Sequence, residues 1–148
     1  MDVKRADVLD LDKIVPLFDA YRMFYQQKSD KDAALAFLKE RLEKQESVVF
    51  FALEGTQAAG FTQLYKTFSS VSLEPFYILN DLYVAPEFRK KGVGEALLNR
   101  AKTFCMEQNG KGLALETAVD NPAQKLYERL GWEKDTDFFH YFWKNNWA

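Results

Sequence analysis

The segment from Arg89 to Gly94 combines positive charge with backbone freedom in a way that suits an anion. It reads Arg-Lys-Lys-Gly-Val-Gly, follows an apolar run ending at Val84, and precedes a run with helical periodicity. Backbone N–H groups at a helix N-terminus bind anions, and the helix dipole adds roughly half a positive charge there. Gly92 lets a ligand approach the backbone closely. The segment predicts a turn that binds a pyrophosphate; a solvated basic turn with structural glycines is the alternative.

Two common nucleotide-binding patterns do not fit this segment. A P-loop requires Gly-Lys followed by Ser or Thr, whereas Gly94 is followed by Glu95 and Ala96. The dinucleotide fingerprint requires a third glycine at the position that Leu97 occupies. A different class of phosphate-containing ligand is therefore expected.

The pattern of apolar residues predicts a mixed α/β fold around this turn. Helical spacing begins at Leu11, a second helix can be capped by Ser29 or Asp30, and Asn121 can cap a short helix that begins at Pro122. The remaining long helix is expected at 93–108, and strands are expected at 3–5, 48–53, 58–65, 76–84, 112–119 and 138–143. The strand–helix–strand order in the middle predicts one parallel pair in a sheet that is otherwise built from hairpins, with helices on its faces.

Composition limits the function classes. The chain has 148 residues, 47% of them hydrophobic, which predicts one globular domain over residues 1–148. The net charge of −2 gives no indication of nucleic-acid binding. The N-terminal residues show no basic segment followed by an apolar run, and no apolar run approaches the length of a membrane span, so we expect a cytoplasmic protein. Cys105 is the single cysteine and His140 the single histidine, which argues against a disulfide and a metal site.

Two motifs together resemble the GNAT acetyltransferases. Residues 89–94 match the (Arg/Gln)-x-x-Gly-x-(Gly/Ala) signature of that family and follow a strand that ends Leu-Tyr-Val-x-Pro, as theirs does. Residues 115–132 match a second family motif, which contains an asparagine and a Leu-Tyr-x-x-x-Gly-Trp ending. The two motifs occur in the family's order and spacing between about residues 76 and 132.

The resemblance implies a GNAT-like fold and acetyl-CoA as co-substrate. That fold is a mixed, largely antiparallel sheet with helices on both faces, in which the central parallel strands 76–84 and 112–119 splay apart at their C-terminal ends. The backbone exposed by the splay would hydrogen bond to the pantetheine arm. The implied cofactor contacts are Leu82, Tyr83, Val84, Arg89, Lys90, Lys91, Gly92, Val93, Gly94 and Asn121.

The resemblance also implies roles in acetyl transfer to an amine by direct attack in a ternary complex. Glu116 is a candidate general base, since some family members carry a functional glutamate at this strand position. Asp81 is the second candidate; on a regular strand its side chain points opposite to those of Asn80 and Leu82. Tyr127 would protonate the departing thiolate. A loop anchor for Glu116, an ion pair for Asp81 and core packing for Tyr127 are the alternatives.

A narrower similarity covers nearly the whole chain and points to the subgroup that contains the yeast histone and polyamine acetyltransferases. It indicates a small amine, polyamine or lysine-like amine as acceptor. Tyr21, Tyr25 and Tyr65 could form an aromatic wall for such a cation, or they could pack in the core.

The aromatic residues near the C-terminus predict self-association. Phe138 to Trp147 is unusually aromatic for a chain end, and we expect a homodimer or larger assembly through it. A non-catalytic acyl-CoA-binding module, or a protein-interaction module of the same fold, is the alternative to an enzyme.

Overall fold

The computed structural model describes residues 1–145, which form two compact units. The first comprises Met1–Glu116, and the second begins at Thr117. Each unit is treated in turn.

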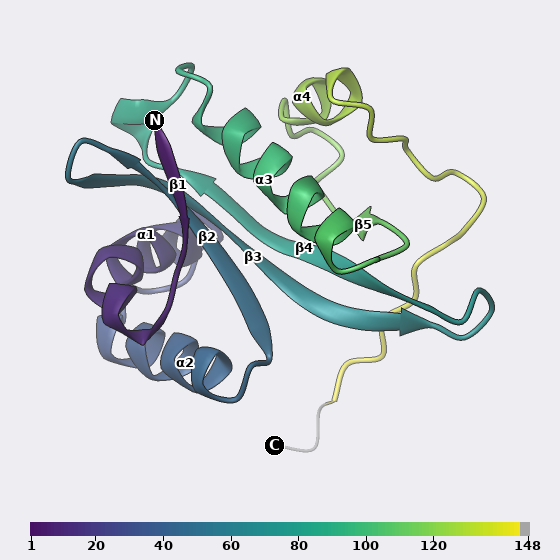
Figure 1. Cartoon of the computed structure of the whole chain (residues 1–148), viewed down its shortest axis with the longest axis horizontal. Coiled ribbons are helices and arrows are strands. Elements are labelled where there is room, and N and C mark those ends of the chain that lie inside the picture. Colours follow the sequence, from purple (N-terminus) through teal and green to yellow (C-terminus); the bar gives the residue numbers. More distant parts are fainter. Residues whose placement is uncertain (146–148) are drawn as a thin grey trace. The chain divides into compact units, whose positions relative to one another are not determined.

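The first unit is built on one twisted sheet of five strands (Figure 1). The strands lie in the spatial order β1 (Asp2–Arg5), β2 (Ser47–Glu54), β3 (Gln57–Ser69), β4 (Glu74–Val84) and β5 (Leu113–Ala114). Neighbouring strands from β1 to β4 pair in antiparallel fashion, while β4 and β5 are parallel. The predicted mixed, largely antiparallel sheet with a parallel pair is confirmed.

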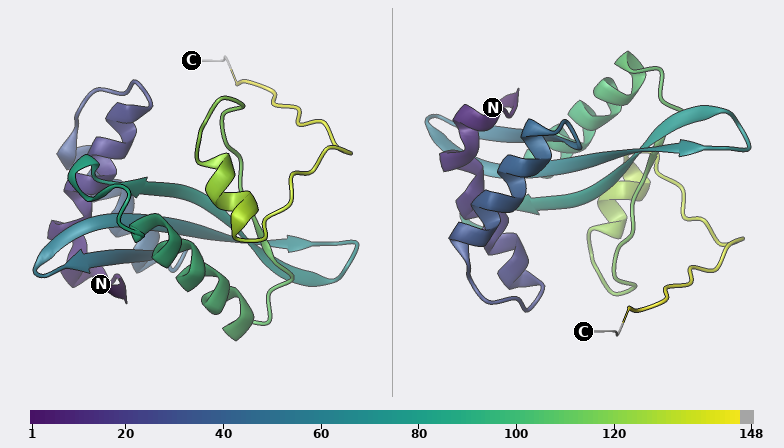
Figure 2. Two further views of the ribbon diagram at one scale, coloured as in Figure 1. Left: turned by 90° about the horizontal axis from the view of Figure 1, so that it is seen from above. Right: turned by 90° about the horizontal axis from the view of Figure 1, so that it is seen from below.

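Helices cover both faces of this sheet (Figure 2). The helices of the first unit are α1 (Leu11–Phe24), α2 (Lys31–Glu43) and α3 (Val93–Glu107), with short 3-10 turns η1 (Val8–Asp10) and η2 (Pro86–Phe88). Phe51 belongs to the core under α1 and α2, whereas its neighbour Phe50 packs against Phe104 of α3 at 5.6 Å between ring centroids. Adjacent strand residues point to opposite faces, so α1 and α2 lie on one face and α3 on the other.

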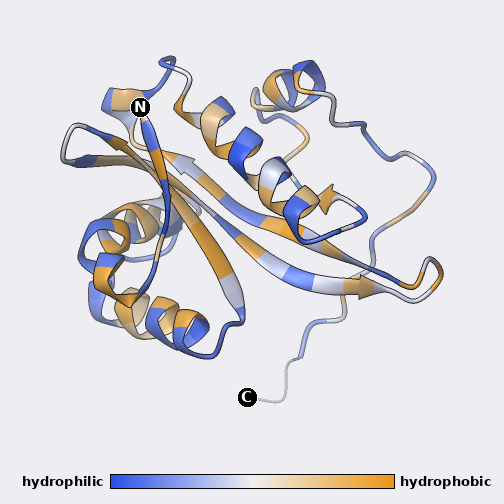
Figure 3. Cartoon of the chain, in the orientation of Figure 1, coloured by the Kyte–Doolittle hydropathy of each residue, from blue (hydrophilic) through white to orange (hydrophobic). Residues whose placement is uncertain are grey.

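Burial on both faces explains the composition of β2. The strand is almost continuously apolar and mostly buried, and Figure 3 colours most of it hydrophobic. Phe50, Phe51 and Val49 are at most 1% exposed. Among the described residues, no helix is long and apolar enough to cross a membrane.

Local capping sets the start of α2 as the sequence predicts. The Asp30 side chain accepts a hydrogen bond from the Ala33 N–H at 3.0 Å, which satisfies one of the N–H groups that a first helical turn leaves without a partner. Helix α3 begins at Val93 as predicted, and Cys105 is buried within it.

The parallel strand β5 is much shorter than predicted. The sequence predicts a strand at 112–119, but only Leu113 and Ala114 pair, with Tyr77 and Ile78 of β4. A strand forms only where its backbone hydrogen bonds to a neighbouring strand. Beyond Ala114 the chain leaves β4, so the β-propensity of the following residues does not extend the strand. The prediction of 112–119 is wrong in length, although the early end of the ladder leaves β4 to continue to Val84 without β5.

The described part of the second unit contains one short helix, α4 (Gln124–Arg129), preceded by turns at residues 119–120 and 122–123. The helix begins at Gln124 and not at Pro122 as predicted. Gly131 adopts a left-handed φ of 91° just after the helix, as expected for a glycine at a helix C-terminus. The Trp132 N–H then donates to the Tyr127 carbonyl at 3.0 Å.

The strand predicted at 138–143 is absent. These residues are irregular, and their aromatic side chains are 80–91% exposed. We call residues 138–143 the aromatic tail; its aromatic members are Phe138, Phe139, Tyr141, Phe142 and Trp143. Aromatic residues favour a strand only when a neighbouring strand supplies hydrogen bonds and packing, and the tail pairs with no described strand. Trp147, which the sequence prediction includes, lies outside the described residues.

Candidate active site

A buried carboxylate lies in the middle of the sheet, on the face covered by α1 and α2. Asp81 of β4 is 3% exposed and stands directly opposite Gln63 of β3, which is fully buried. The Gln63 side-chain N–H donates a short hydrogen bond to Asp81 Oδ2. Burying a charged group costs free energy unless the group is hydrogen-bonded, and the bond from Gln63 reduces this cost for Asp81. The two residues form a polar pair within a mostly apolar part of the sheet.

A β-bulge at Asn80 shapes this site. Gln63 pairs with Asp81 and Leu64 with Leu79, so Asn80 is an extra residue in β4. The sequence predicts that Asp81 points away from Asn80, as on a regular strand; that is wrong, because the bulge breaks the alternation. The Asn80 side-chain amide instead donates to Asp81 Oδ1 at 2.9 Å.

Tyrosine side chains surround the carboxylate. The Tyr21 hydroxyl donates to the Asn80 carbonyl at 3.3 Å, and the Tyr21 ring lies 5.1 Å from the Tyr25 ring and 6.3 Å from the Tyr83 ring. Tyr65 is half-buried on the same face, close enough to Asp81 for the negative charge of the carboxylate to raise the pKa of its hydroxyl group. Tyr21 and the half-exposed Tyr25 are thus in ring contact. That Tyr21, Tyr25 and Tyr65 form a wall for a cation stays a prediction.

The surroundings shift the pKa values of Asp81, Tyr21 and Tyr65. Burial raises the pKa of Asp81 above the usual range of a carboxyl group, while hydrogen bonds from Gln63, Asn80 and Tyr21 oppose the increase. Burial and the negative charge of Asp81 raise the pKa of Tyr65 to about 12 and that of Tyr21 further. Tyr21 and Tyr65 therefore remain neutral near pH 7.

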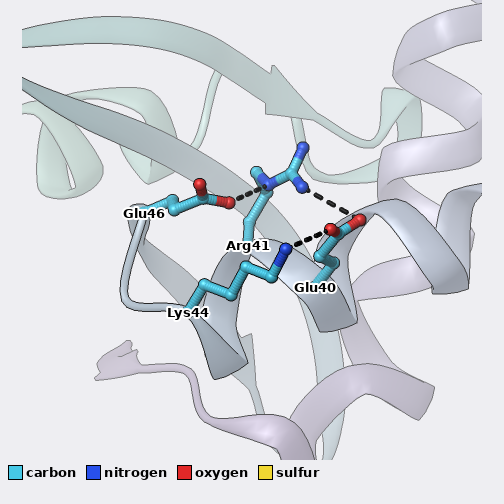
Figure 4. Close-up of polar contacts among 4 residues, drawn as sticks. All are labelled: Glu40, Arg41, Lys44 and Glu46. Atoms are coloured by element: carbon cyan, nitrogen blue, oxygen red, sulfur yellow. Dashed lines mark hydrogen bonds and ion pairs between the residues drawn. The ribbon is translucent and has the colours of Figure 1, made fainter.

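An open hollow of about 340 Å³ lies beside Tyr65 and is lined by Phe37, Arg41, Glu46 and Tyr65. Arg41 binds two carboxylates, with Nε 2.8 Å from Glu46 Oε1 and a terminal nitrogen 3.1 Å from Glu40 Oε2 (Figure 4). Its guanidinium also lies 4.7 Å from the centre of the Phe37 ring. The positive charge of Arg41 is therefore already balanced within the protein.

The predicted anion-binding turn leads from β4 into α3. Lys90 and Gly92 have left-handed φ values of 64° and 84°, and α3 begins at the next residue, Val93. No side chain among residues 1–145 caps α3, so within this range the first-turn N–H groups, including those of Val93 and Gly94, are not occupied by a cap. The backbone at Gly92 requires glycine, because a side chain would be strained in this conformation.

Arg89 fixes this turn to the end of β4. Its Nε donates to the Val84 carbonyl at 2.9 Å, and its guanidinium lies 5.6 Å from the centre of the Tyr83 ring. Lys91 lies over the Phe88 ring at 5.7 Å. Arg89 thus has a structural role that the sequence did not predict, and all three basic residues, Arg89, Lys90 and Lys91, are exposed.

The C-terminal part of β4, beyond the residues that pair with β5, has one open edge within the first unit. Strand β5 pairs only with Tyr77 and Ile78, so the edge at Leu82, Tyr83 and Val84 faces no strand of residues 1–116. A chain of amide groups, such as a pantetheine arm, could add to such an edge in the manner of a strand. The predicted contact region and the anion-binding turn therefore follow one another along β4 and into α3.

The other predicted residues lie elsewhere along the chain. Glu116 is exposed at the end of the first unit. Asn121 and Tyr127 belong to the second unit, where Asn121 Oδ1 accepts from the Ala123 N–H at 2.9 Å and Tyr127 contacts Trp132 at 6.1 Å between ring centroids. Their parts in the reaction stay predictions. Among residues 1–145, no three His, Cys, Asp or Glu side chains are grouped so as to hold a metal ion.

Sequence reasoning missed Gln63, Asn80 as a bulge, and Arg41. Gln63 is a polar residue within a mostly buried strand, which was the available signal for it. The available signal for the Arg41 ion pairs was the spacing of Glu40 and Lys44, which are four residues apart on one helix face. Lys44 Nζ lies 2.7 Å from Glu40 Oε1, and Glu40 also binds Arg41.

Comparison with known proteins agrees with this geometry. The sequence model of the acetyltransferase (GNAT) family matches residues 13–132. The chain belongs to this family. GNAT proteins take an acyl group from acetyl-CoA, so the chain is an acyltransferase.

Individual relatives are consistent with that assignment. The chain is 50% identical over 142 residues to the uncharacterized N-acetyltransferase YhfO of Bacillus subtilis (strain 168), covering 95% of each protein. The crystal structure of a probable acetyltransferase superimposes with a TM-score of 0.93 at 40% identity and covers 99% of each chain. An aminoglycoside N-acetyltransferase in complex with CoA shares the fold with a TM-score of 0.80 at 22% identity, covering 97% of this chain and 95% of that one. The similarity to yeast histone and polyamine acetyltransferases stays a prediction.

Proposed function

We propose that this GNAT acetyltransferase transfers the acetyl group of acetyl-CoA to a primary amine by direct attack in a ternary complex. The observation that carries the proposal is the position of Asp81, a buried carboxylate on β4 just before the open edge at Leu82–Val84 and the anion-binding turn. A base and the expected site of the co-substrate thereby share one strand.

The reaction balances with these groups. The nitrogen of the amine attacks the acetyl carbonyl carbon, a C–N bond forms and the C–S bond breaks. Asp81 accepts the proton that the ammonium form must lose, directly or through one water molecule. After attack the nitrogen still carries one proton that the amide does not keep. Tyr127 donates a proton to the departing thiolate and is reprotonated by this second proton, while Asp81 releases the first proton to water, so that the products are an amide, the CoA thiol and one proton in solution. Cys105 is buried in α3, which disfavours an acetyl-enzyme intermediate.

The chain's own residues suit the phosphate-containing part of acetyl-CoA. First-turn N–H groups of α3 and the exposed Lys90 and Lys91 would bind the pyrophosphate. The backbone at Leu82, Tyr83 and Val84 would bind the pantetheine arm, with Asn121 as a further contact. A family relative of the same fold was crystallised with CoA, which supports this choice of ligand.

Asp81 is a better candidate base than Glu116. Its burial raises its pKa, so that it can accept a proton more readily near neutral pH than an ordinary carboxylate, and half-buried tyrosines lie beside it. Glu116 is exposed at the end of the first unit. We retain Glu116 as the alternative base.

A free-thiol assay with acetyl-CoA and a panel of amines tests the proposal. Thiol release that requires an amine, and that falls sharply in Asp81→Asn but not in Glu116→Gln, is the expected result. If calorimetry detects CoA binding but no amine on a broad panel releases thiol, the chain is a non-catalytic acyl-CoA-binding module. If Glu116→Gln alone abolishes turnover, Glu116 is the base.

We further propose that the protein is a cytoplasmic homodimer or larger assembly formed through the aromatic tail. Five aromatic side chains within six residues are 80–91% exposed, an apolar surface that a monomer rarely leaves in water. Small amines, polyamines and lysine-like amines are the proposed acceptors, without nucleic acid or membrane as partners.

A further inference from the structure

Gln63 contains an unusual unsatisfied group. Its side-chain nitrogen is committed to Asp81 Oδ2, and within the described residues its Oε1 is buried without a hydrogen-bond partner. A buried acceptor without a donor is destabilising, and an apolar residue of similar size would avoid the cost. Gln63 is fully buried, so solvent at the surface does not compensate.

The neighbouring carboxylate also has acceptor capacity to spare. Asp81 Oδ1 accepts from Asn80 and Oδ2 from Gln63, and the Tyr21 hydroxyl is a third donor beside the carboxylate, whereas a carboxylate offers about four acceptor positions. The centre of the cluster therefore has more acceptors than donors, together with a negative charge. An ammonium group supplies three N–H donors and the missing positive charge.

The walls of the cluster suit a cation with an apolar stem. The half-buried rings of Tyr21 and Tyr65 lie near Asp81, and aromatic faces attract alkylammonium groups. Tyr65 also lines the open hollow, whose other lining residues are Phe37 and the ion-paired Arg41 and Glu46, so the rings of Phe37 and Tyr65 offer aromatic contact for the rest of a ligand.

The same surroundings disfavour an acceptor with a carboxylate beside its amine. Such a group would be brought against Asp81 where screening by water is weak. Arg41, the cation that lines the hollow, is already bound to Glu40 and Glu46.

We infer that Asp81 and Gln63 form the site that binds the acceptor amine in its ammonium form, and that the acceptors are primary alkylamines without a carboxylate next to the amine. The ammonium would donate to the Asp81 carboxylate and to Gln63 Oε1, with its stem between Tyr65 and Phe37. This inference rests on the proposed function and names the substrate class for the same site. When the proton passes from nitrogen to Asp81, the neutral amine is left in place for attack.

Three matched amines test the substrate class on the wild-type protein. Pentylamine carries the amine alone, norleucine adds a carboxylate at the carbon that bears the amine, and norleucinamide adds similar bulk without the charge. We expect kcat/KM for norleucine to be at least about tenfold below that for pentylamine, and norleucinamide to remain near pentylamine, because a buried like-charge contact costs at least that much. Equal or better use of norleucine would overturn the inference and leave acetyl transfer intact.

A variant of Gln63 tests the site itself. Gln63→Met keeps the side-chain volume and removes both polar atoms, and Gln57→Met makes the same change at an exposed position of the same strand. We expect Gln63→Met to raise the KM for pentylamine about 10- to 100-fold, the range for losing a hydrogen bond to a charged group, with CoA affinity unchanged. An unchanged KM in folded Gln63→Met would contradict the inference.

Calorimetric titration of pentylammonium chloride, without acetyl-CoA, separates this inference from the proposed function. Binding to the wild type that is weakened in Gln63→Met and retained in Gln57→Met supports the ammonium site even if no thiol is released. No binding to the wild type, together with amine-dependent thiol release, would leave the acetyltransferase proposal standing and overturn the ammonium site.

Discussion

At the scale of single residues, the chemistry depends on how Asp81 is held. Hydrogen bonds from Gln63, Asn80 and Tyr21 lower the pKa of Asp81, and burial raises it. The effect of burial is the larger, so the pKa is raised. Asp81 was the second candidate base from sequence because it is a carboxylate on the strand predicted to lie beside that of Glu116. The hydrogen-bond partners of Asp81 could not be predicted, because they depend on the bulge at Asn80. The bulge depends in turn on the pairing register of β3 and β4, which the sequence of one strand alone does not determine.

Replacing Asp81 with Asn should reduce kcat/KM by about 10²–10⁴-fold, the usual contribution of a general base. In the wild type, kcat/KM should fall as pH decreases through the raised pKa of Asp81, because protonation removes the base. Rates measured across pH for wild type, Asp81→Asn and Glu116→Gln check this prediction. The acid limb should disappear in Asp81→Asn and persist in Glu116→Gln; an acid limb that persists in Asp81→Asn would assign it to another group.

The same substitution should stabilise the protein at neutral pH. Because the pKa of Asp81 is raised on folding, the folded state keeps its proton to higher pH than the unfolded chain does. Stability therefore falls as pH rises through the interval between the ordinary and the raised pKa, and Asn removes that loss. Urea unfolding should give a higher midpoint for Asp81→Asn than for wild type near pH 8, with the difference shrinking toward pH 4. A lower midpoint at pH 8 would show that the ionised carboxylate stabilises the fold.

Replacing Tyr127 with Phe should lower kcat by about 10²–10⁴-fold and leave CoA affinity nearly unchanged, because only proton donation to the thiolate is lost. Steady-state kinetics and calorimetry measure the two effects. Undiminished turnover would exclude Tyr127 from the mechanism and leave its packing against Trp132 as its role.

At the scale of elements, the path from β4 through the basic turn to α3 positions the expected co-substrate. The start of α3 at Val93 and the cap of α2 at Asp30 agree with the sequence, because caps and glycine turns are local signals. The length of β5 was wrong because strand length depends on a partner. The end of that ladder after Ile78 and Ala114 opens the edge of β4.

Replacing Gly92 with Ala should destabilise the protein by about 1–2 kcal/mol, since a side chain at its left-handed φ is strained although no neighbour lies within 4 Å of the new Cβ. CoA affinity should fall as well, because the turn would shift. Gly112→Ala is the matched control: its Cβ also has open space, and its backbone is not left-handed. Urea unfolding and CoA titration of both variants test this prediction. Equal effects of the two substitutions would mean that the left-handed backbone at Gly92 is not what makes its replacement costly.

At the scale of the whole molecule, the sequence predicts a strand where the structure has an exposed aromatic tail. β-Propensity in residues 138–143 is high, yet a strand needs hydrogen-bond partners that no described strand supplies. A second copy of the chain is the partner we propose.

A chain that ends at Asp137 should be monomeric where the full chain is a dimer or larger, because the exposed aromatic side chains are removed. Light scattering across a range of protein concentrations measures the mass directly. A double variant, Val71→Ser with Leu73→Ser, removes exposed apolar side chains at the tip of the β3–β4 hairpin and should keep the assembly. A full chain that is monomeric throughout would exclude the tail as an interface.

The most direct test of acetyl transfer is the stoichiometry of thiol release and amine acetylation with purified wild-type protein, acetyl-CoA and pentylamine. We expect one acetylated amine for each CoA thiol, with neither formed when the amine or the protein is left out. Thiol release without any acetylated amine would mean that water, not an amine, is the acceptor, and would contradict the central claim.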